Sequence, residues 1–338
     1  MTAVSVIIPT FGRGEWFRAA LDSALAQQLT DIEILIGDNG RDDTKRRMLA
    51  DYDDPRIRYV QHETNLGPQG NWVELVRLAR SPLVASLHDD DVWEPNFLSS
   101  LVPILEAEPQ VQMAFCDYWL IDAAGRRLEA ETDAVTRMNA RDRLPAGVVA
   151  GGLDEMLRLV AVHNAPQPAY AAVFRRDAAL IDYPDDISPL YDIWLSYSIA
   201  RAGGQFAYVP ERLTRYRQHP GTGTSKGFAV AEDRVFERML AAHPDSPVAD
   251  EIRRKWAWLR WGRAAVAMDQ PDGRERSQAE FRAAARHLDG GRRLVASACG
   301  RVDIAWTGLR AVRRLRNRVR PSRTRSDQPR GAAVHPPS

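Results

Sequence analysis

Short apolar runs alternate with segments of helical periodicity over roughly the first 120 residues. The apolar runs have the length of buried strands and lie at 3–8, 32–37, 57–60, 82–87 and 111–119. Between them, apolar side chains recur every three or four positions, which predicts helices over 16–25, 72–78 and 95–106. This alternation is typical of the α/β class, with a central, mostly parallel sheet flanked by helices. In such sheets, ligands bind beyond the carboxyl ends of the strands.

The pattern changes after the last of these strands. Residues 122–165 are less regular, and a mixed pattern then predicts a strand over 169–174, a helix over 192–202 and a strand over 206–209. Beyond Phe228 the periodicity is helical throughout. We therefore predict a first domain over 1–225 and a helical region over 226–320. Residues 321–338 are rich in Arg, Pro, Ser and Gly, which predicts a disordered basic tail.

Composition places the chain among ordinary water-soluble proteins. Of 338 residues, 44% are apolar and 27% charged, and no window offers the ~18 uninterrupted apolar residues of a membrane span. Met1 leads straight into the first predicted strand without a basic segment, so we expect no signal peptide. Cys116 and Cys299 form neither a metal-binding spacing nor a disulfide framework. A reduced, cytoplasmic setting is expected.

A net charge of +1 conceals a strong asymmetry along the chain. Between Arg292 and Arg330 there are twelve arginines and two aspartates, a local net of +10, so the remainder carries about −9. Over 305–319, apolar residues and arginines fall mostly on opposite faces of a predicted helix. Such a helix suits an anionic membrane, here the inner face of the plasma membrane, and packing against the acidic body is an equal alternative. Nucleic-acid binding is not expected, because the rest of the chain is acidic.

Three consecutive carboxylates, Asp89, Asp90 and Asp91, follow the fourth predicted strand. Adjacent carboxylates repel one another unless a cation compensates for them. Hard oxygen ligands suit Mg²⁺ or Mn²⁺, which commonly bridge carboxylates to a diphosphate. The alternative is a solvated acidic loop that precedes the next helix.

Polar residues also follow the first two strands. Asp38 lies in the segment Gly37-Asp38-Asn39-Gly40, where it could accept hydrogen bonds from a base or ribose, or form an Asx turn. Pro9, Thr10 and Phe11 follow the first strand, and Phe11 could stack on a base or cover the sheet edge. No GxGxxG pattern is present there, which disfavours a dinucleotide-binding domain.

Three later segments offer further candidates. Asn71 lies in a Gly-rich turn that opens a helix, where free N–H groups can approach a ligand. Asp192 begins another helix, either as a cap or as a general base. Arg217 and His219 belong to a cluster of basic residues that favours an anionic ligand, although arginine on a strand commonly faces solvent.

Taken in order, these segments resemble the inverting glycosyltransferases of family 2, which have the GT-A fold. The resemblance spans about residues 3–225 and lies in the order and spacing of the segments. It implies metal binding by Asp90, Asp91 and His219 and a catalytic base at Asp192. The residues that it implies for nucleotide-sugar binding are Pro9, Thr10, Phe11, Asp38, Asn71, Asp89 and Arg217.

Two positions depart from the family pattern. Many relatives carry Asp where His88 stands, and many carry an acidic residue where Tyr191 precedes the base. Asp90 is the first choice for the metal, and Asp186 is the nearest alternative to Asp192 as base.

The resemblance implies metal-dependent transfer, with Mn²⁺ or Mg²⁺, from a nucleoside diphosphate sugar to an acceptor hydroxyl with inversion. UDP is the commonest donor nucleotide among relatives, and dTDP and GDP are alternatives. The implied acceptor is a sugar, a lipid-linked group or a small molecule, in the synthesis of a polysaccharide, glycolipid or glycosylated metabolite. A sugar nucleotidyltransferase and a non-catalytic nucleotide-sugar-binding module are competing interpretations.

Overall fold

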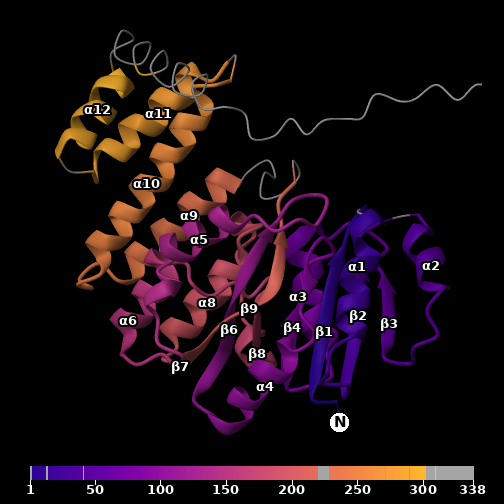
Figure 1. Cartoon of the computed structure of the whole chain (residues 1–338). Coiled ribbons are helices and arrows are strands. Elements are labelled where there is room, and N and C mark those ends of the chain that lie inside the picture. The colour runs from indigo at the N-terminus through magenta and orange to yellow at the C-terminus, as the bar shows by residue number, and fades with distance from the viewer. Residues whose placement is uncertain are drawn as a thin grey trace, which may run out of the picture. The chain divides into compact units, whose positions relative to one another are not determined.

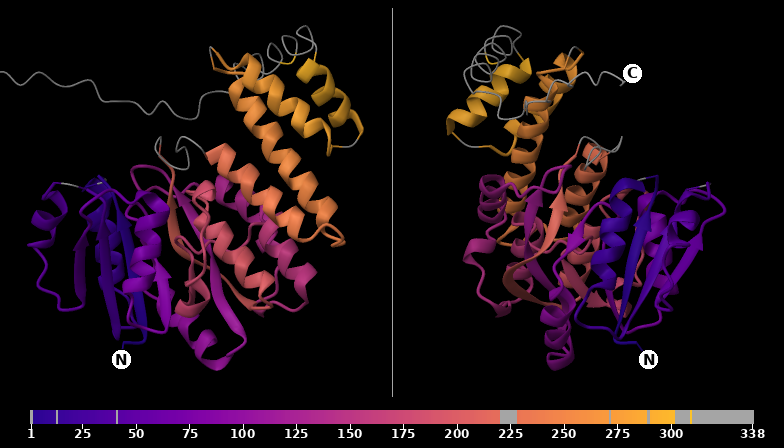
Figure 2. Two further views of the ribbon diagram at one scale, coloured as in Figure 1. Left: turned by 180° about the vertical axis from the view of Figure 1, so that it is seen from behind. Right: turned by 45° about the vertical axis from the view of Figure 1, so that its right-hand side comes forward.

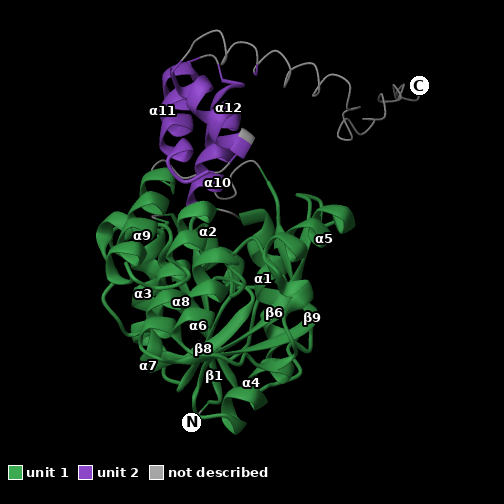
Figure 3. Cartoon of the chain, turned by 90° about the vertical axis from the view of Figure 1, so that its left-hand side faces the viewer, with its two compact units in different colours: residues 1–255 green, residues 256–338 purple. Residues whose placement is uncertain are grey.

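A computed structural model describes residues 2–12, 14–40, 42–219, 228–270, 272–288, 290–301 and 309. The chain divides into two compact units, residues 1–255 and 256–338 (Figure 3). The helix α9 (Phe228–Ala242) belongs to the first unit, beyond the predicted boundary at residue 225. That boundary and the separate tail remain predictions.

The first half of the sheet in unit 1 is parallel (Figure 1). Its strands are β1 (Val4–Thr10), β2 (Ile32–Asp38), β3 (Ile57–Gln61) and β4 (Leu83–Ser86), with β1 between β2 and β4. Thr10 pairs with Asp38, which in turn pairs with Gln61. The carboxyl ends of these strands therefore meet at one edge, where the loops that carry the candidate residues begin.

The second half of the sheet is mixed. The remaining strands are β5 (Val92–Trp93), β6 (Val111–Ile121), β7 (Gly147–Val148), β8 (Ala172–Arg175) and β9 (Gln205–Arg217), and the strand order is β3-β2-β1-β4-β8-β6-β9-β5, with β7 on β9. The strand β8 lies antiparallel between β4 and β6, whereas β6 and β9 are parallel. The predicted α/β fold with a central sheet is confirmed, and the N-terminal half of that sheet is parallel throughout.

The strand β9 is far longer than the predicted strand over 206–209. Its partner β6 pairs Cys116 with Val209 and then Asp117 with Arg212, so Pro210 and Glu211 are accommodated in a bulge. Proline cannot donate to a sheet ladder, and bulges are where it is tolerated. Because the strand resumes after the bulge, it carries Tyr216 and Arg217 to the edge where the candidate residues lie.

Helices cover both faces of the sheet (Figure 2). Alternate residues of β1 and β2, such as Val6 and Ile34, share one core with α1 (Gly14–Leu25) and α4 (Phe97–Ala107). On the opposite face, α3 (Gly67–Leu78) approaches so closely that a Cβ at Gly37 would lie 2.3 Å from Asn71 Oδ1. Glycine at this position therefore permits the contact between β2 and α3.

The other helices of unit 1 are α2 (Thr44–Leu49), α5 (Glu129–Met138), α6 (Leu153–Leu157), α7 (Arg176–Ala179) and α8 (Tyr191–Arg201), with short helical turns at Arg141–Arg143, Arg158–Val162 and Asp185–Ile187. The helix α10 (Ala249–Ala267) begins in unit 1 and continues into unit 2, which adds α11 (Arg274–Ala285) and α12 (Gly290–Arg301). The predicted helical region is thus confirmed for the described residues beyond 228. None of the helices in the described part of the chain is long and apolar enough to cross a membrane.

The core of unit 2 is small and built largely from alanines. Phe281, Ala264 and Ala284 are fully buried within it, and Trp261 packs edge-on against Phe281 with the ring centroids 5.1 Å apart. Leu309 also packs against this core. The rest of the predicted basic helix over 305–319 and the tail over 321–338 lie outside the described residues.

Candidate active site

A cavity of about 450 Å³ opens at the edge of the sheet where the strands of its first half end. Loops after β1, β2 and β4 form its wall together with the starts of α3 and α8 and the end of β9. The lining residues are Pro9, Thr10, Phe11, Asn39, Asn65, Gly67, Pro68, Asn71, His88, Asp89, Asp90, Ala169, Pro189, Leu190, Tyr191, Asp192, Tyr216 and Phe228. Most of the residues that the sequence predicted for the site are therefore gathered in one place.

Asp89 ties the loop after β4 to the loop after β1. Its Oδ2 accepts hydrogen bonds from Thr10 Oγ1 at 2.6 Å and from the backbone N–H of Phe11 at 3.3 Å. Thr10 and Asp89 are both buried, whereas the Phe11 ring is 58% exposed. An exposed aromatic ring beside a fixed loop can stack on a planar group that enters the cavity.

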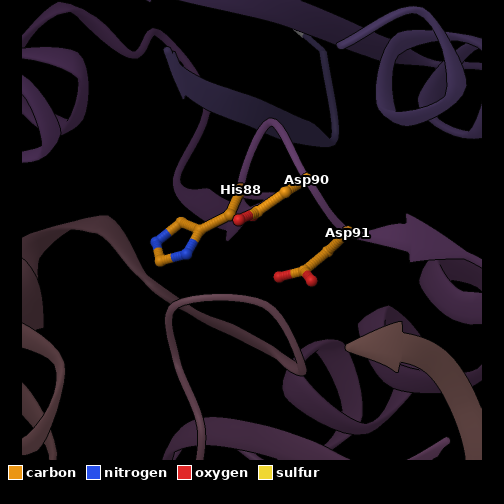
Figure 4. Close-up of side chains that lie close together, drawn as sticks. All are labelled: His88, Asp90 and Asp91. Atoms are coloured by element: carbon orange, nitrogen blue, oxygen red, sulfur yellow. The ribbon is translucent and has the colours of Figure 1, made fainter. Parts of the chain in front are cut away.

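His88, Asp90 and Asp91 form a cluster that could hold a metal ion. One candidate ligand atom from each lies within 4.8 Å of the others, and Figure 4 shows the two carboxylates turned toward the imidazole. Asp91 is fully buried, and its Oδ2 has no hydrogen-bond partner among the described residues. Two carboxylates and an imidazole suit a divalent cation such as Mn²⁺. This donor set and the unpartnered oxygen both fit the implied metal.

Burial is the main reason that the pKa of Asp91 lies well above its usual value, and the neighbouring charge of Asp90 raises it further. A buried carboxylate without a compensating charge is costly. A divalent cation would supply that charge and favour the ionised form of Asp91. The raised pKa of Asp91 and the arrangement of the three side chains therefore both favour a divalent cation as the ligand.

The end of β9 holds this loop in place. The backbone N–H of Arg217 donates to Asp91 Oδ1 at 2.9 Å, and Arg217 Nε donates to the carbonyl of Asp90 at 2.8 Å. His219 Nε2 lies 2.9 Å from Asp90 Oδ2. Arg217 is only 5% exposed, so it acts here from within the wall. The predicted roles of Arg217 in donor binding and of His219 as a metal ligand remain predictions.

Asp192 faces the same cavity from the first turn of α8. Its Oδ1 accepts a hydrogen bond from the backbone N–H of Ile193 at 2.8 Å. Burial raises the pKa of Asp192 to about 6. A carboxylate with a pKa near neutrality is suited to accept a proton at physiological pH.

Asp186, the alternative base, lies in a different environment. Both of its oxygens are 2.9 Å from Arg238 Nη2, in an ion pair whose two side chains are each 45% exposed. This pairing outside the cavity wall makes Asp186 a natural control for Asp192.

Asp38 is buried and is not among the residues that line the cavity. Its Oδ1 accepts from the Gly40 N–H at 2.7 Å, as in an Asx turn, and its Oδ2 accepts from the Tyr59 hydroxyl at 2.8 Å. The neighbouring Asn39 lines the cavity and bridges to the start of α3 through the carbonyl of Gly67 and the N–H of Leu66. A contact between Asp38 and a nucleotide remains a prediction.

Asn71 lines the cavity and also joins two of the elements that form its wall. Its Nδ2 donates to the carbonyl of Gly37 at 2.8 Å, and its Oδ1 lies 2.9 Å from His62 Nε2. These bonds fix the start of α3 against the end of β2.

Sequence reasoning assigned no role in the site to Asn39, Tyr216 or His88, although all three line it. Asn39 adjoins the predicted Asp38, and Tyr216 adjoins the predicted Arg217, so both lay within reach of the sequence. His88 was noted only as a departure from the family pattern. Its Nε2 lies 2.8 Å from the hydroxyl of Tyr191, the second departure. No local signal could have joined two residues so far apart in the chain.

Comparison with known protein families gives a match for the N-terminal part of the chain. Residues 5–142 match the family described as glycosyl transferase family 2. The uncharacterized protein Rv1520 of Mycobacterium tuberculosis is 26% identical over 224 residues, which are 64% of this chain and 59% of that protein. The chain thus spans less than two thirds of the length of this relative.

Solved structures share the fold. TarS 1–349 from S. aureus has a TM-score of 0.66 at 14% identity and covers 95% of this chain and 93% of its own. The mannosyltransferase PcManGT from Pyrobaculum calidifontis has a TM-score of 0.51 at 17% identity, with 94% and 87% covered. Residues 5–142 thus carry the match to glycosyltransferase family 2, and the chain has the GT-A fold with a C-terminal helical region. The sequence prediction of family and fold is confirmed.

Proposed function

We propose that the chain transfers a sugar from a nucleoside diphosphate sugar to an acceptor hydroxyl, with inversion at the anomeric carbon and with the help of a divalent cation. The observation that carries this proposal is the shared cavity. Asp192, a carboxylate with a pKa near 6, lines the same cavity as His88 and Asp90 of the cation cluster. A base and a diphosphate-binding group on one cavity are what direct displacement at a sugar requires.

The donor occupies the part of the cavity between the loops after β1 and β4. The loop around Phe11 receives the base, and the acidic loop receives the diphosphate. His88, Asp90 and Asp91 would hold the cation, which supplies positive charge for the departing diphosphate. Arg217 and His219 keep Asp90 and Asp91 in place.

The acceptor enters on the side of Asp192. The carboxylate takes the proton of the acceptor hydroxyl while that oxygen forms a bond to the anomeric carbon. The bond from the anomeric carbon to the diphosphate oxygen breaks in the same step, and its electron pair leaves with the nucleoside diphosphate. Because attack and departure occur on opposite faces, a single displacement inverts the anomeric centre.

A UDP-sugar is the donor that the relatives support best. TarS 1–349 has been solved with UDP-GlcNAc and with UDP, whereas PcManGT was solved with GDP-Man and Mn²⁺. We propose UDP for this chain, with Mn²⁺ or Mg²⁺. The acceptor is a sugar, a lipid-linked group or a small molecule of a biosynthetic pathway.

Donor hydrolysis tests the proposed function directly. The full chain is incubated with UDP-GlcNAc, UDP-Glc or GDP-Man, with Mn²⁺ or with EDTA, and release of the nucleoside diphosphate is measured. We expect release from at least one donor only when the cation is present. Release of nucleoside monophosphate or pyrophosphate would instead support a nucleotidyltransferase. Binding of the donor without release of any product would support a non-catalytic module.

Transfer should weaken in acid. Because Asp192 has a pKa of about 6, it is protonated below that pH and cannot accept the acceptor proton. We expect kcat/KM to fall about tenfold for each pH unit below 6, measured with saturating donor and Mn²⁺. UDP binding measured at the same pH values separates this effect from loss of the donor site. A flat profile down to pH 5, with binding intact, would exclude Asp192 as the titrating base.

We also propose that the enzyme works in the cytoplasm, in contact with the inner face of the membrane through its arginine-rich C-terminal segment. The support is the sequence pattern over 305–319, in which arginines oppose apolar residues. Replacing Arg313, Arg314 and Arg318 by Glu should weaken binding to vesicles that contain phosphatidylserine by about 100-fold or more, since each basic residue contributes about 1 kcal/mol. Vesicles of neutral lipid are the control. Equal binding by both proteins would favour a helix packed on the body.

A further inference from the structure

The two departures from the family pattern contact one another. His88 lies in the loop after β4 and Tyr191 at the start of α8, 103 positions further along the chain. His88 Nε2 and the Tyr191 hydroxyl are 2.8 Å apart. Tyr191 immediately precedes Asp192, so this hydrogen bond joins the acidic loop to the helix that carries the proposed base. A pair formed from both departures suggests that they act together.

Tyr191 is held rigidly. Its ring is 4% exposed and stacks on Trp72 with the centroids 5.0 Å apart. Trp72 is fully buried, and its Nε1 donates to Ser86 Oγ at 3.1 Å. The hydroxyl of Tyr191 is therefore fixed relative to β4, the strand that leads into the acidic loop. A fixed hydroxyl can set the orientation of the imidazole that it contacts.

The imidazole held in this way belongs to the candidate cation cluster with Asp90 and Asp91. Figure 4 shows the carboxylates of Asp90 and Asp91 on one side of the His88 Cβ and the ring on the other, and one ligand atom from each of the three residues lies within 4.8 Å of the others. Asp91 Oδ2, fully buried and without a partner among the described residues, is a second and independent sign of a ligand at this point. With Nε2 on the Tyr191 hydroxyl, Nδ1 is the nitrogen that could bind a cation. In that tautomer Nε2 carries the proton and donates a hydrogen bond to the hydroxyl oxygen of Tyr191.

We infer that His88 is a nitrogen ligand of the cation, that Tyr191 is its positioning residue, and that this pair makes the site prefer Mn²⁺ to Mg²⁺. The inference rests on the proposed cation-dependent function and specifies which ion it uses. Magnesium favours oxygen ligands, whereas an imidazole nitrogen suits transition metals. Histidine ligands commonly donate their second ring N–H to a neighbouring acceptor, which fixes both tautomer and orientation. In this protein the acceptor is the hydroxyl of Tyr191, the first residue of α8.

Ion binding measured apart from turnover tests the inference. The full chain is titrated with Mn²⁺ in the presence of UDP, with free Mn²⁺ followed by electron paramagnetic resonance, and Mg²⁺ is then added as a competitor. We expect the ratio of Mn²⁺ to Mg²⁺ affinity to fall about tenfold or more in His88→Asp, which replaces nitrogen by oxygen. Tyr191→Phe should lower Mn²⁺ affinity by roughly 10–100-fold, because it removes only the orienting hydroxyl.

Tyr183→Phe is the matched control. Tyr183 packs against the same Trp72, with the centroids 5.8 Å apart, but its hydroxyl donates to the carbonyl of Ala179 at 3.1 Å. This variant should bind Mn²⁺ as the parent does. Tyr191→Phe added to His88→Asp should cause little further loss of Mn²⁺ affinity, because the two residues act through one ligand.

The outcomes separate the inference from the function beneath it. If the parent binds Mn²⁺ with UDP and transfers sugar, but His88→Asp keeps the same ion preference, His88 is not a ligand and only the inference falls. Equal losses in Tyr191→Phe and Tyr183→Phe would mean that the effect is structural, which also overturns it. If the parent binds neither ion with UDP, the proposed cation dependence falls as well.

Discussion

Replacement of Asp192 by Asn is expected to lower turnover by about 10²–10⁴-fold while donor affinity stays near normal, since a general base acts on the acceptor. Asp192 lines the cavity, and burial raises its pKa to about 6, so the carboxylate can take a proton near neutral pH. Asparagine keeps the size of the side chain and removes the basic oxygen. Single-turnover transfer and equilibrium binding of the donor, measured side by side with Mn²⁺ present, separate the two effects.

Thermal stability distinguishes this role from helix capping. The residue before α8, Leu190, makes no side-chain capping bond, and Asp192 accepts from the adjacent N–H of Ile193. Loss of a cap would cost about 1 kcal/mol. However, the folded-state pKa of Asp192 lies above the ordinary 3.8, so ionisation costs stability as the pH rises through 6. We therefore expect Asp192→Asn to melt no earlier than the parent at pH 8.

Asp186→Asn is the control for this pair of measurements. Asp186 is bound to Arg238 in an exposed ion pair, and such pairs contribute about 0–1 kcal/mol. Its replacement should leave turnover within about twofold, because it removes only this surface pair. Retained turnover in Asp192→Asn, with earlier melting, would assign Asp192 a structural role and place the base elsewhere.

Replacement of Asp90 by Asn is expected to abolish the Mn²⁺-dependent part of UDP binding and to lower turnover by about 10²–10³-fold, the usual loss for one charge-stabilising group. Asp90 is 4% exposed and belongs with His88 and Asp91 to the candidate cation cluster. Its charge also raises the pKa of the fully buried Asp91. In EDTA, the variant should therefore melt no earlier than the parent, because one of two repelling charges is gone.

The thermal shift produced by UDP and Mn²⁺ measures the Mn²⁺-dependent part of UDP binding. The parent should be stabilised when both are added, since a ligand that binds only the folded state raises its stability. Asp90→Asn should show little of this shift, whereas Asp54→Asn, which alters a half-buried carboxylate paired with Arg56 outside the cavity wall, should show all of it. Undiminished turnover and a full Mn²⁺-dependent shift in Asp90→Asn would contradict the metal assignment.

Local patterns determined the first half of the fold and most of the site. The apolar runs of β1 and β2 and the helical spacing of α1 and α3 are properties of neighbouring residues, so periodicity revealed them. The rule that ligands bind beyond strand ends then selected the segments after β1, β2 and β4. Thr10, Asp90 and Asp192 line one cavity, as the order of motifs implied.

Tertiary structure alone decided the order and direction of the strands in the second half of the sheet. The strand β8 inserts between β4 and β6, and β9 continues past Pro210 because a bulge against β6 accommodates it. Strand order and bulges depend on hydrogen bonds between residues far apart in the chain. From the local sequence, Pro210 therefore predicted the end of a strand. In the structure, β9 pairs with β6 again after the bulge.

The same distinction holds for individual side chains in the site. The sequence identified Asp38 and Arg217 as polar residues near strand ends, but not that Tyr59 and Gly40 occupy the oxygens of Asp38. Nor could it show that Arg217 donates to the backbone of the acidic loop, or that Tyr191 contacts His88. Residue type limits which bonds a side chain can make, whereas the packing of distant elements decides which of those bonds it forms.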